Sequence, residues 1–194
     1  MPLDRYPIKG VIWYQGESNA HNYEAHEKLF RLLVGSWREN WNDPDLPFYY
    51  VQLSSIDRPS WPWFRDSQRR LMDAIPHTGM AVSSDYGDSL DVHPKNKRPI
   101  GERLAHWALN RTYDKKQVVP SGPLFRSVDF REDAAYVSFD YADGLHTADG
   151  RPIREFEIAE TEGVYYPAKA EVVGNQVKVY SDRVKHPCHV RYAW

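Results

Sequence analysis

The sequence predicts an α/β domain with a parallel sheet, followed by an antiparallel β-rich region. Up to about residue 110, short apolar runs alternate with stretches of helical periodicity, which is the pattern of βαβ units whose strands pair in parallel. From Ser121 onward the helical period disappears, and short alternating runs are separated by turns rich in Gly, Asp and Asn. Residues 114–122 separate the two patterns. We therefore predict an α/β domain over residues 1–115 and a β-rich region over residues 121–194.

The first half contains three strand-like and three helix-like segments. We predict strands over residues 8–14, 47–53 and 80–83, and helices over residues 22–41, 64–75 and 99–110. The first helix has the clearest signal, because apolar residues recur along it at spacings of three and four. These residues are Leu29, Phe30, Leu33, Trp37 and Trp41. Asn22 is a suitable N-cap for this helix, and Pro44 follows its end.

The second half consists of short alternating segments. We predict strands over residues 124–130, 135–141, 155–159, 168–173, 176–180 and 189–192. The dipeptide Gly174-Asn175 separates two of these strands and is a hairpin signal, and Asp149-Gly150 marks another turn. The region is therefore expected to be antiparallel.

Composition excludes several functional classes. The 194 residues include 25 Lys and Arg against 27 Asp and Glu, a net charge of −2, whereas a nucleic-acid-binding surface needs a surplus of cations. No apolar run approaches the roughly 20 residues of a membrane helix, and the first ten residues lack the apolar stretch of a signal peptide. The single cysteine, Cys188, excludes an intramolecular disulfide. We expect no nucleic-acid partner and no membrane partner.

The first candidate site is the pentapeptide from Gln15 to Asn19, which lies between a predicted strand and a predicted helix. Loops at the carboxyl ends of parallel strands line the ligand crevice of open α/β sheets. Gly16 allows close approach of the backbone to a substrate, and the Gln15 amide can donate to a developing oxyanion. A simple strand-to-helix turn, in which Ser18 or Asn19 caps the helix, explains the same residues.

The second candidate site is the segment from Asp88 to Pro94, which again follows a predicted strand. A catalytic histidine needs a carboxylate on one ring nitrogen, and Asp91 can reach His93 if the loop is extended. Pro94 disfavours helical backbone at His93 and so keeps the ring at the edge of the loop. A surface Asp–His pair worth about 0–1 kcal/mol has the same local pattern.

Aromatic residues are numerous, at 14% of the chain, and two of them are candidates for substrate contact. Trp61 and Trp63 lie close together in the sequence and would suit stacking on a sugar ring, although core packing explains such rings equally well. His21 and His26 are five residues apart and do not share a helix face, so we expect no zinc site.

Several segments together resemble the sialate O-acetylesterase family of SGNH hydrolases, which are carbohydrate esterases. They are WYQGESN (13–19), FYYVQL (48–53), FRDSQ (64–68), DVHPKNK (91–97) and GERLA (101–105). The β-rich part also looks like the region that follows the esterase core in bacterial members. The resemblance implies a flavodoxin-like SGNH-hydrolase three-layer sheet, followed by an antiparallel β-rich C-terminal region. It implies no metal or organic cofactor.

Carried over by position, the resemblance makes His93 the catalytic base and Asp91 the carboxylate that orients it. The superfamily spaces these residues as Asp-x-x-His, whereas Leu90 occupies that slot here, which leaves Asp88 as an alternative orienter. Gln15 and Gly16 match the block that supplies the oxyanion hole. Glu17 is expected to brace this loop.

The family carries its nucleophilic serine in a Gly-Gln-Ser-Asn segment, and this sequence contains none. Ser18, after Gly16, is a weak substitute because its loop already matches the oxyanion block. We therefore expect a fragment that lacks its first strand(s) and its nucleophile, is inactive alone, and is open to stabilisation by homo-oligomerisation.

The expected substrate is an O-acetylated sugar, and the expected reaction of the parent protein is removal of acetyl groups from sialic acid. Esterases acting on acetylated xylan or another polysaccharide, and an inactive sugar-binding or assembly module, are the alternatives. The resemblance also implies a periplasmic or otherwise exported parent.

Overall fold

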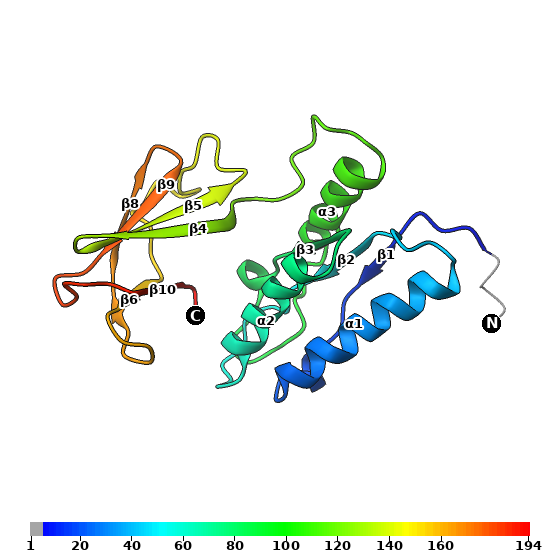
Figure 1. The fold of residues 1–194 in the computed structure, drawn as a ribbon, viewed down its shortest axis with the longest axis horizontal. Helices are drawn as coiled ribbons and strands as arrows, with labels where there is room; N and C mark the ends of the chain where they lie inside the picture. The colour runs from blue at the N-terminus through cyan, green and yellow to red at the C-terminus, as the bar shows by residue number, and fades with distance from the viewer. Residues whose placement is uncertain (1–5) are drawn as a thin grey trace. The chain divides into compact units, whose positions relative to one another are not determined.

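Two units make up the chain in the computed structural model, which describes residues 6–194. The first unit ends at Ser121, and the second runs from Gly122 to Trp194. The helices all lie in the first unit as far as the chain is described, and the second unit is formed by strands and loops (Figure 1).

The first unit is built on a parallel sheet, as predicted. Its strands are β1 (Val11–Trp13), β2 (Phe48–Val51) and β3 (Thr78–Ala81), in the order β1-β2-β3. Both pairings are parallel, with Ile12 opposite Tyr49 and Tyr49 opposite Gly79. The carboxyl ends of all three strands therefore lie at the same edge of the sheet.

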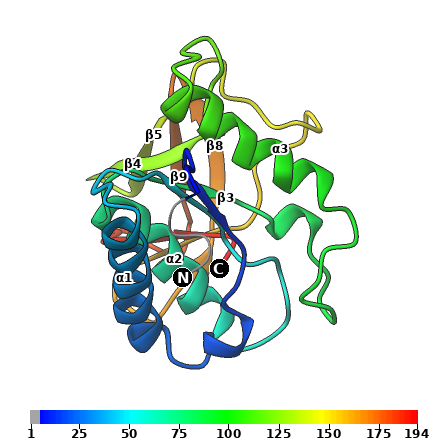
Figure 2. The ribbon, with the colours of Figure 1, turned by 90° about the vertical axis from the view of Figure 1, so that its right-hand side faces the viewer.

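Three helices cover the two faces of this sheet. They are α1 (Tyr23–Asn40), α2 (Trp61–Ala74) and α3 (Arg98–Trp107), and a π-helical turn (Ala108–Thr112) extends α3. Phe48 and Tyr50 point into a core shared with α1 and α2, whereas Tyr49 stacks on Trp107 of α3 at 6.3 Å between ring centroids. The alternation of side chains along β2 thus produces three layers, with α1 and α2 on one face and α3 on the other (Figure 2).

Helix α1 begins where the sequence predicts, and four of the five residues of its predicted apolar face, Phe30, Leu33, Trp37 and Trp41, are buried in or packed against the core. The Asn22 side chain accepts a hydrogen bond from the Ala25 N–H at 3.0 Å and caps the helix. Its buried residues are His26, Phe30 and Val34, and Leu29 is 55% exposed. The predicted inclusion of Leu29 in the core face was wrong, because the buried stripe runs through a histidine that a hydrophobicity pattern leaves out.

Helix α2 begins three residues earlier than predicted. Pro62 lies in its first turn, where a proline loses no hydrogen bond, and this allows Trp61 to start the helix. Trp61 and Phe64 are thereby placed on the buried face, with 1% and 0% of their surfaces exposed.

The second unit is antiparallel, as predicted. Its strands are β4 (Leu124–Arg131), β5 (Ala134–Asp140), β6 (Phe156–Ala159), β7 (Tyr166–Pro167), β8 (Lys169–Val173), β9 (Gln176–Tyr180) and β10 (His189–Tyr192). They form one sheet in the order β4-β5-β9-β8 and another in the order β10-β6-β7. The two sheets share a hydrophobic core that includes Val137, Ile158 and Val179.

The predicted hairpin at Gly174-Asn175 is confirmed. Val173 pairs with Gln176, which leaves a two-residue turn, and Gly174 has a φ of 62° that glycine adopts without strain. Strand β7 was not predicted, because it has only two residues and one of them is Pro167. Among residues 6–194, no helix has the length and apolar character needed to cross a bilayer.

Candidate active site

The loop after β3 brings His93 and Asp91 together. Asp91 Oδ1 lies 3.1 Å from His93 Nδ1 and also accepts the His93 backbone N–H at 2.9 Å. Asp88 accepts from the Leu90 N–H instead, at 2.8 Å, so the geometry pairs the histidine with Asp91. If Nδ1 carries the proton that points at Asp91, Nε2 keeps a lone pair and can accept a proton.

The charge on Asp91 is stabilised locally. The backbone N–H of His93 is the main group that holds the pKa of the Asp91 carboxyl below its usual value, and the His93 ring and Lys95 contribute in the same direction. Asp91 is therefore ionised at neutral pH, as an orienting carboxylate must be. Both side chains reach solvent, with 75% of His93 and 48% of Asp91 exposed.

Hydrogen bonds from other elements hold this loop in place. Ser55 Oγ donates to the Ser84 carbonyl at 2.8 Å, near the start of the loop. The Asp57 N–H donates to the Ser89 carbonyl at 3.0 Å. Arg103 of α3 forms two hydrogen bonds to Asp85, at 2.7 and 2.6 Å. The loop is thus tied both to the segment after β2 and to α3.

The Gln15–Asn19 loop follows β1 and has its own polar contacts. Gln15 Nε2 donates to Asn19 Oδ1 at 3.1 Å, which leaves the second amide hydrogen of Gln15 for another acceptor. The Gly16 N–H donates to Glu17 Oε2 at 3.0 Å, so this N–H is already engaged. Of the two expected oxyanion groups, Gln15 is therefore the better placed to donate to a substrate.

Gly16 is required by both its backbone and its surroundings. Its φ of 146° is disfavoured for residues with a side chain, and a Cβ at this position would lie 2.9 Å from Phe64 Cζ. Ser18 is exposed and has no hydrogen bond to His93 within residues 6–194. The loop therefore packs directly on α2 but does not couple Ser18 to the base.

One hydrophobic cluster supports both predicted site segments. Its buried members are Ala20, Leu53, Trp61 and Phe64, and we call it the platform. Tyr14, which precedes Gln15, and Val92, which lies between Asp91 and His93, both pack against it. Two residues 78 positions apart in the sequence thus pack against the same cluster.

Trp61 is part of the platform and does not face solvent. It is 1% exposed, and its Nε1 donates to the Ser54 carbonyl, so the expectation that Trp61 stacks on a sugar is corrected by its burial. Trp63 is 48% exposed. Its side chain remains open to substrate contact.

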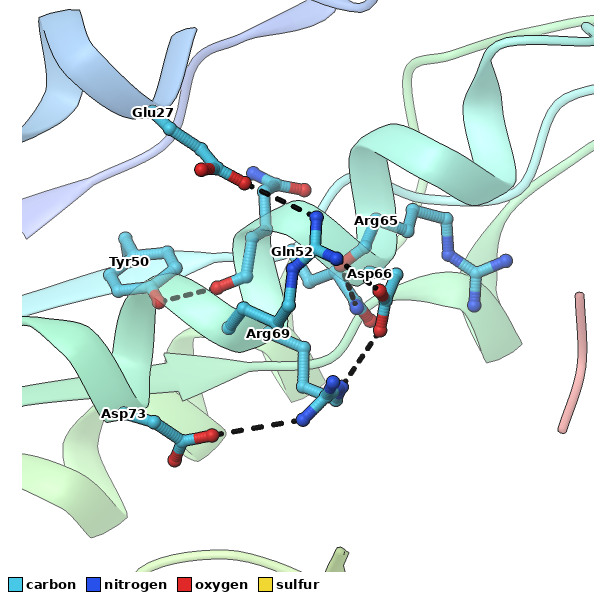
Figure 3. Close-up of polar contacts among 9 residues, drawn as sticks. Glu27, Tyr50, Gln52, Arg65, Asp66, Arg69 and Asp73 are labelled. Atoms are coloured by element: carbon cyan, nitrogen blue, oxygen red, sulfur yellow. Dashed lines mark hydrogen bonds and ion pairs between the residues drawn. The ribbon is translucent and has the colours of Figure 1, made fainter. Parts of the chain in front are cut away.

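A polar network that the sequence did not reveal fixes α2 against β2 (Figure 3). The Tyr50 hydroxyl donates to the Gln68 carbonyl at 2.7 Å, and Gln52 Nε2 donates to the Arg65 carbonyl at 2.9 Å. Gln68 Oε1 accepts the Leu53 N–H at 2.9 Å. These bonds hold the platform in position. Gln52 and Gln68 lie within segments that carry the family resemblance, and Gln68 also stands with Arg65 near the start of a predicted helix, where either a polar site or a solvated face is expected.

Two further features of the described residues concern metal binding and cavities. No group of three or more His, Cys, Asp or Glu side chains within residues 6–194 is placed to hold a metal ion. A hollow of about 210 Å³ lies in the second unit, lined by Phe125, Val128 and Phe130 of β4 together with Tyr165 and residues 188–190. It includes none of the predicted site residues.

Comparison with known proteins identifies relatives of both the sequence and the fold. The sequence profile described as carbohydrate esterase, sialic acid-specific acetylesterase, matches residues 3–110. The sialate O-acetylesterases of Rattus norvegicus and Homo sapiens align with the whole of this chain at 26% and 27% identity. The chain in turn covers only 40% and 42% of the lengths of these two proteins. The crystal structure of a carbohydrate acetylesterase from Xanthomonas citri matches with a TM-score of 0.91 and 38% identity, over the whole chain and 46% of that protein.

Proposed function

Because the chain belongs to the family of sialic acid-specific acetylesterases, which are carbohydrate esterases, we propose that it carries the proton-transfer part of an O-acetylesterase site. In this proposal His93 is the general base, Asp91 orients it, and the Gln15 amide stabilises the oxyanion. The observation that carries the proposal is the platform, on which the segments of Gln15 and His93 both rest.

The proposed reaction is a two-step acyl transfer. A serine hydroxyl attacks the acetyl carbonyl while His93 Nε2 takes its proton; when the bond between the acetyl carbon and the sugar oxygen breaks, the same nitrogen gives the proton to that oxygen, and the sugar leaves with a free hydroxyl. Asp91 stabilises the imidazolium formed between these events. Gln15 donates to the negative oxygen of the tetrahedral intermediate. A water molecule, activated by His93, then releases acetate and regenerates the serine.

We further propose that the serine comes from outside this sequence, which contains no Gly-Gln-Ser-Asn segment. The chain spans less than half of each relative described above, so those proteins have room for such a segment elsewhere. The edge of β1 is a suitable place for it: within the described residues β1 pairs only with β2, and Ile12 is 69% exposed whereas its neighbour Tyr49 is 3% exposed. A strand added there would complete a flavodoxin-like SGNH-hydrolase sheet that lacks its first strand(s).

Two assays test the proposal. The 194-residue chain alone is expected neither to hydrolyse p-nitrophenyl acetate nor to react with a serine-directed phosphonate, because it lacks the nucleophile.

In a longer protein that includes the Gly-Gln-Ser-Asn segment, His93→Ala should reduce kcat/KM by about a thousandfold or more. His106→Ala, at an exposed histidine of α3, is the matched control and should keep full activity. Activity that survives His93→Ala would refute the base assignment, and phosphonate labelling at Ser18 would identify a self-contained enzyme.

The substrate proposed first is an O-acetylated sialic acid, in line with the family description. A second candidate is another acetylated carbohydrate, such as an acetylated xylan, because the relative with the higher identity, 38% against 26–27%, is described as a carbohydrate acetylesterase without mention of sialic acid. Acetate release from O-acetylated sialic acid and from acetylated xylan by the longer protein distinguishes the two. We also propose an exported location for that protein.

A further inference from the structure

The backbone on both sides of His93 is held by side chains from other positions. The Val92 carbonyl accepts a hydrogen bond from Ser54 Oγ at 3.0 Å, and the Pro94 carbonyl accepts one from Lys97 Nζ at 3.0 Å. Ser54 is 1% exposed, so its hydroxyl approaches the loop from within the protein. Because the His93 side chain is 75% exposed, packing of the ring contributes little to its position, and these two bonds act together with the His93 N–H to Asp91 bond to hold its backbone.

Lys97 also contacts the other half of the candidate site. Its Nζ lies 5.4 Å from the centroid of the Tyr14 ring, within the range of a cation–π interaction, and Tyr14 directly precedes Gln15. The backbone of Lys97 caps α3, where its carbonyl accepts the Gly101 N–H at 3.0 Å. The Lys97 ammonium group therefore extends from the start of α3. It contacts both the loop that carries His93, at Pro94, and the residue that precedes Gln15, Tyr14.

We propose that Ser54 and Lys97 are positioning residues for the base: together they clamp the two carbonyls that flank His93, and Lys97 also sets the distance between this loop and the Gln15 loop. The catalytic meaning of the clamp rests on the proposed role of His93. The two hydrogen bonds of the clamp lie within this chain, so they can be tested without an enzyme assay.

The chain offers matched variants for the test. Ser54→Ala removes one clamp bond without changing charge, and Lys97→Met removes the other together with a positive charge. Lys97→Arg keeps a charged donor that can reach Pro94. Lys95→Met removes the same charge from a neighbouring lysine that has no hydrogen bond within residues 6–194 but acts on the Asp91 charge. Circular dichroism and thermal melting of each variant establish that it is folded.

The measurements are made by NMR on the 194-residue chain. Ser54→Ala and Lys97→Met should each speed hydrogen exchange of the His93 N–H by about fivefold, the equivalent of one hydrogen bond. Each should also raise the pKa of Asp91 toward its ordinary value, because the His93 N–H is the main group that lowers it. Lys97→Arg should restore both quantities, whereas Lys95→Met should leave the exchange rate unchanged.

Two outcomes would overturn the inference. In the first, Lys97→Met leaves both the hydrogen-exchange rate of the His93 N–H and the pKa of Asp91 at their wild-type values. This variant remains informative even if Ser54→Ala unfolds, because Lys97 is exposed. The other is equal acceleration of exchange by Lys95→Met and Lys97→Met, which would assign the effect to charge alone. If the clamp behaves as expected while the longer protein stays active after His93→Ala, the proposed function fails and the clamp stands.

Discussion

At the scale of single residues, His26 shows how a polar side chain enters this core. Its ring is 5% exposed and lies between Phe30 and Phe64, with ring centroids 5.8 and 4.6 Å away. Burial lowers the pKa of His26, because the charged form loses its hydration. The folded protein therefore contains neutral His26 over a pH range in which the unfolded chain would protonate it.

The linkage between this pKa and folding gives a pH prediction. The folded-state pKa lies below the unfolded value of about 6.5, so the unfolded state binds the extra proton and gains stability as the pH falls through that value. The first unit should lose stability as the pH falls below about 7, through the unfolded-state pKa of about 6.5, and His26→Leu should remove this part of the pH dependence. Urea denaturation followed by tryptophan fluorescence measures it, since six of the seven tryptophans lie in the first unit. His106→Leu, at an exposed site, should retain the wild-type profile, and a His26→Leu profile identical to wild type would contradict the prediction.

At the scale of elements, the contact between β3 and α3 depends on a glycine. A Cβ at Gly79 would lie 2.4 Å from Cδ2 of Trp107, a ring that also stacks on Tyr49 and donates from Nε1 to the Met80 carbonyl at 3.0 Å. Trp107 is therefore fixed from two sides and cannot move away.

Gly79→Ala should accordingly destabilise the first unit by about 3 kcal/mol, by overpacking. The control is Gly35→Ala in α1, where a Cβ meets nothing within 4 Å and where alanine should stabilise the helix by about 0.5–1 kcal/mol. The free energies of unfolding come from urea titrations at constant pH. Equal stability of the two variants would show that the β3–α3 contact adapts to the added methyl group.

The elements of this chain were largely predictable, and the partners of their side chains were not. The N-cap at Asn22 and the hairpin at Gly174 depend on local chemistry that the sequence displays. The burial of Trp61 and the bond from Ser54 to Val92 depend on which segments meet in space, and no local pattern encodes that. The Asp91–His93 contact lies between these cases, because two residues in one turn can interact through local geometry alone.

At the scale of the whole molecule, we expect the edge of β1 to affect the behaviour of the chain in solution. Within residues 6–194, β1 pairs only with β2, and an open strand edge beside an exposed isoleucine is a surface on which another strand can pair. The isolated chain should therefore self-associate, and Ile12→Lys should shift it toward the monomer in size-exclusion chromatography with light scattering.

Leu90→Lys is the control for this experiment, because Leu90 is even more exposed, at 89%, but lies in a loop. It should leave the association state unchanged. A monomeric wild-type chain, or an equal effect of the two variants, would argue against association through β1.

The platform separates the enclosed side chains near the candidate site from the exposed ones. Gln15, Trp63 and His93 are exposed to solvent, whereas Trp61 and Phe64 are enclosed in the platform on which Tyr14 and Val92 pack. In the longer protein of the proposed function, we therefore expect that randomising the outward positions around Trp63 can change ester preference while the two enclosed rings are left untouched. Mutating those rings would disturb both loops together, so such variants of the longer protein should lose activity rather than gain new preferences.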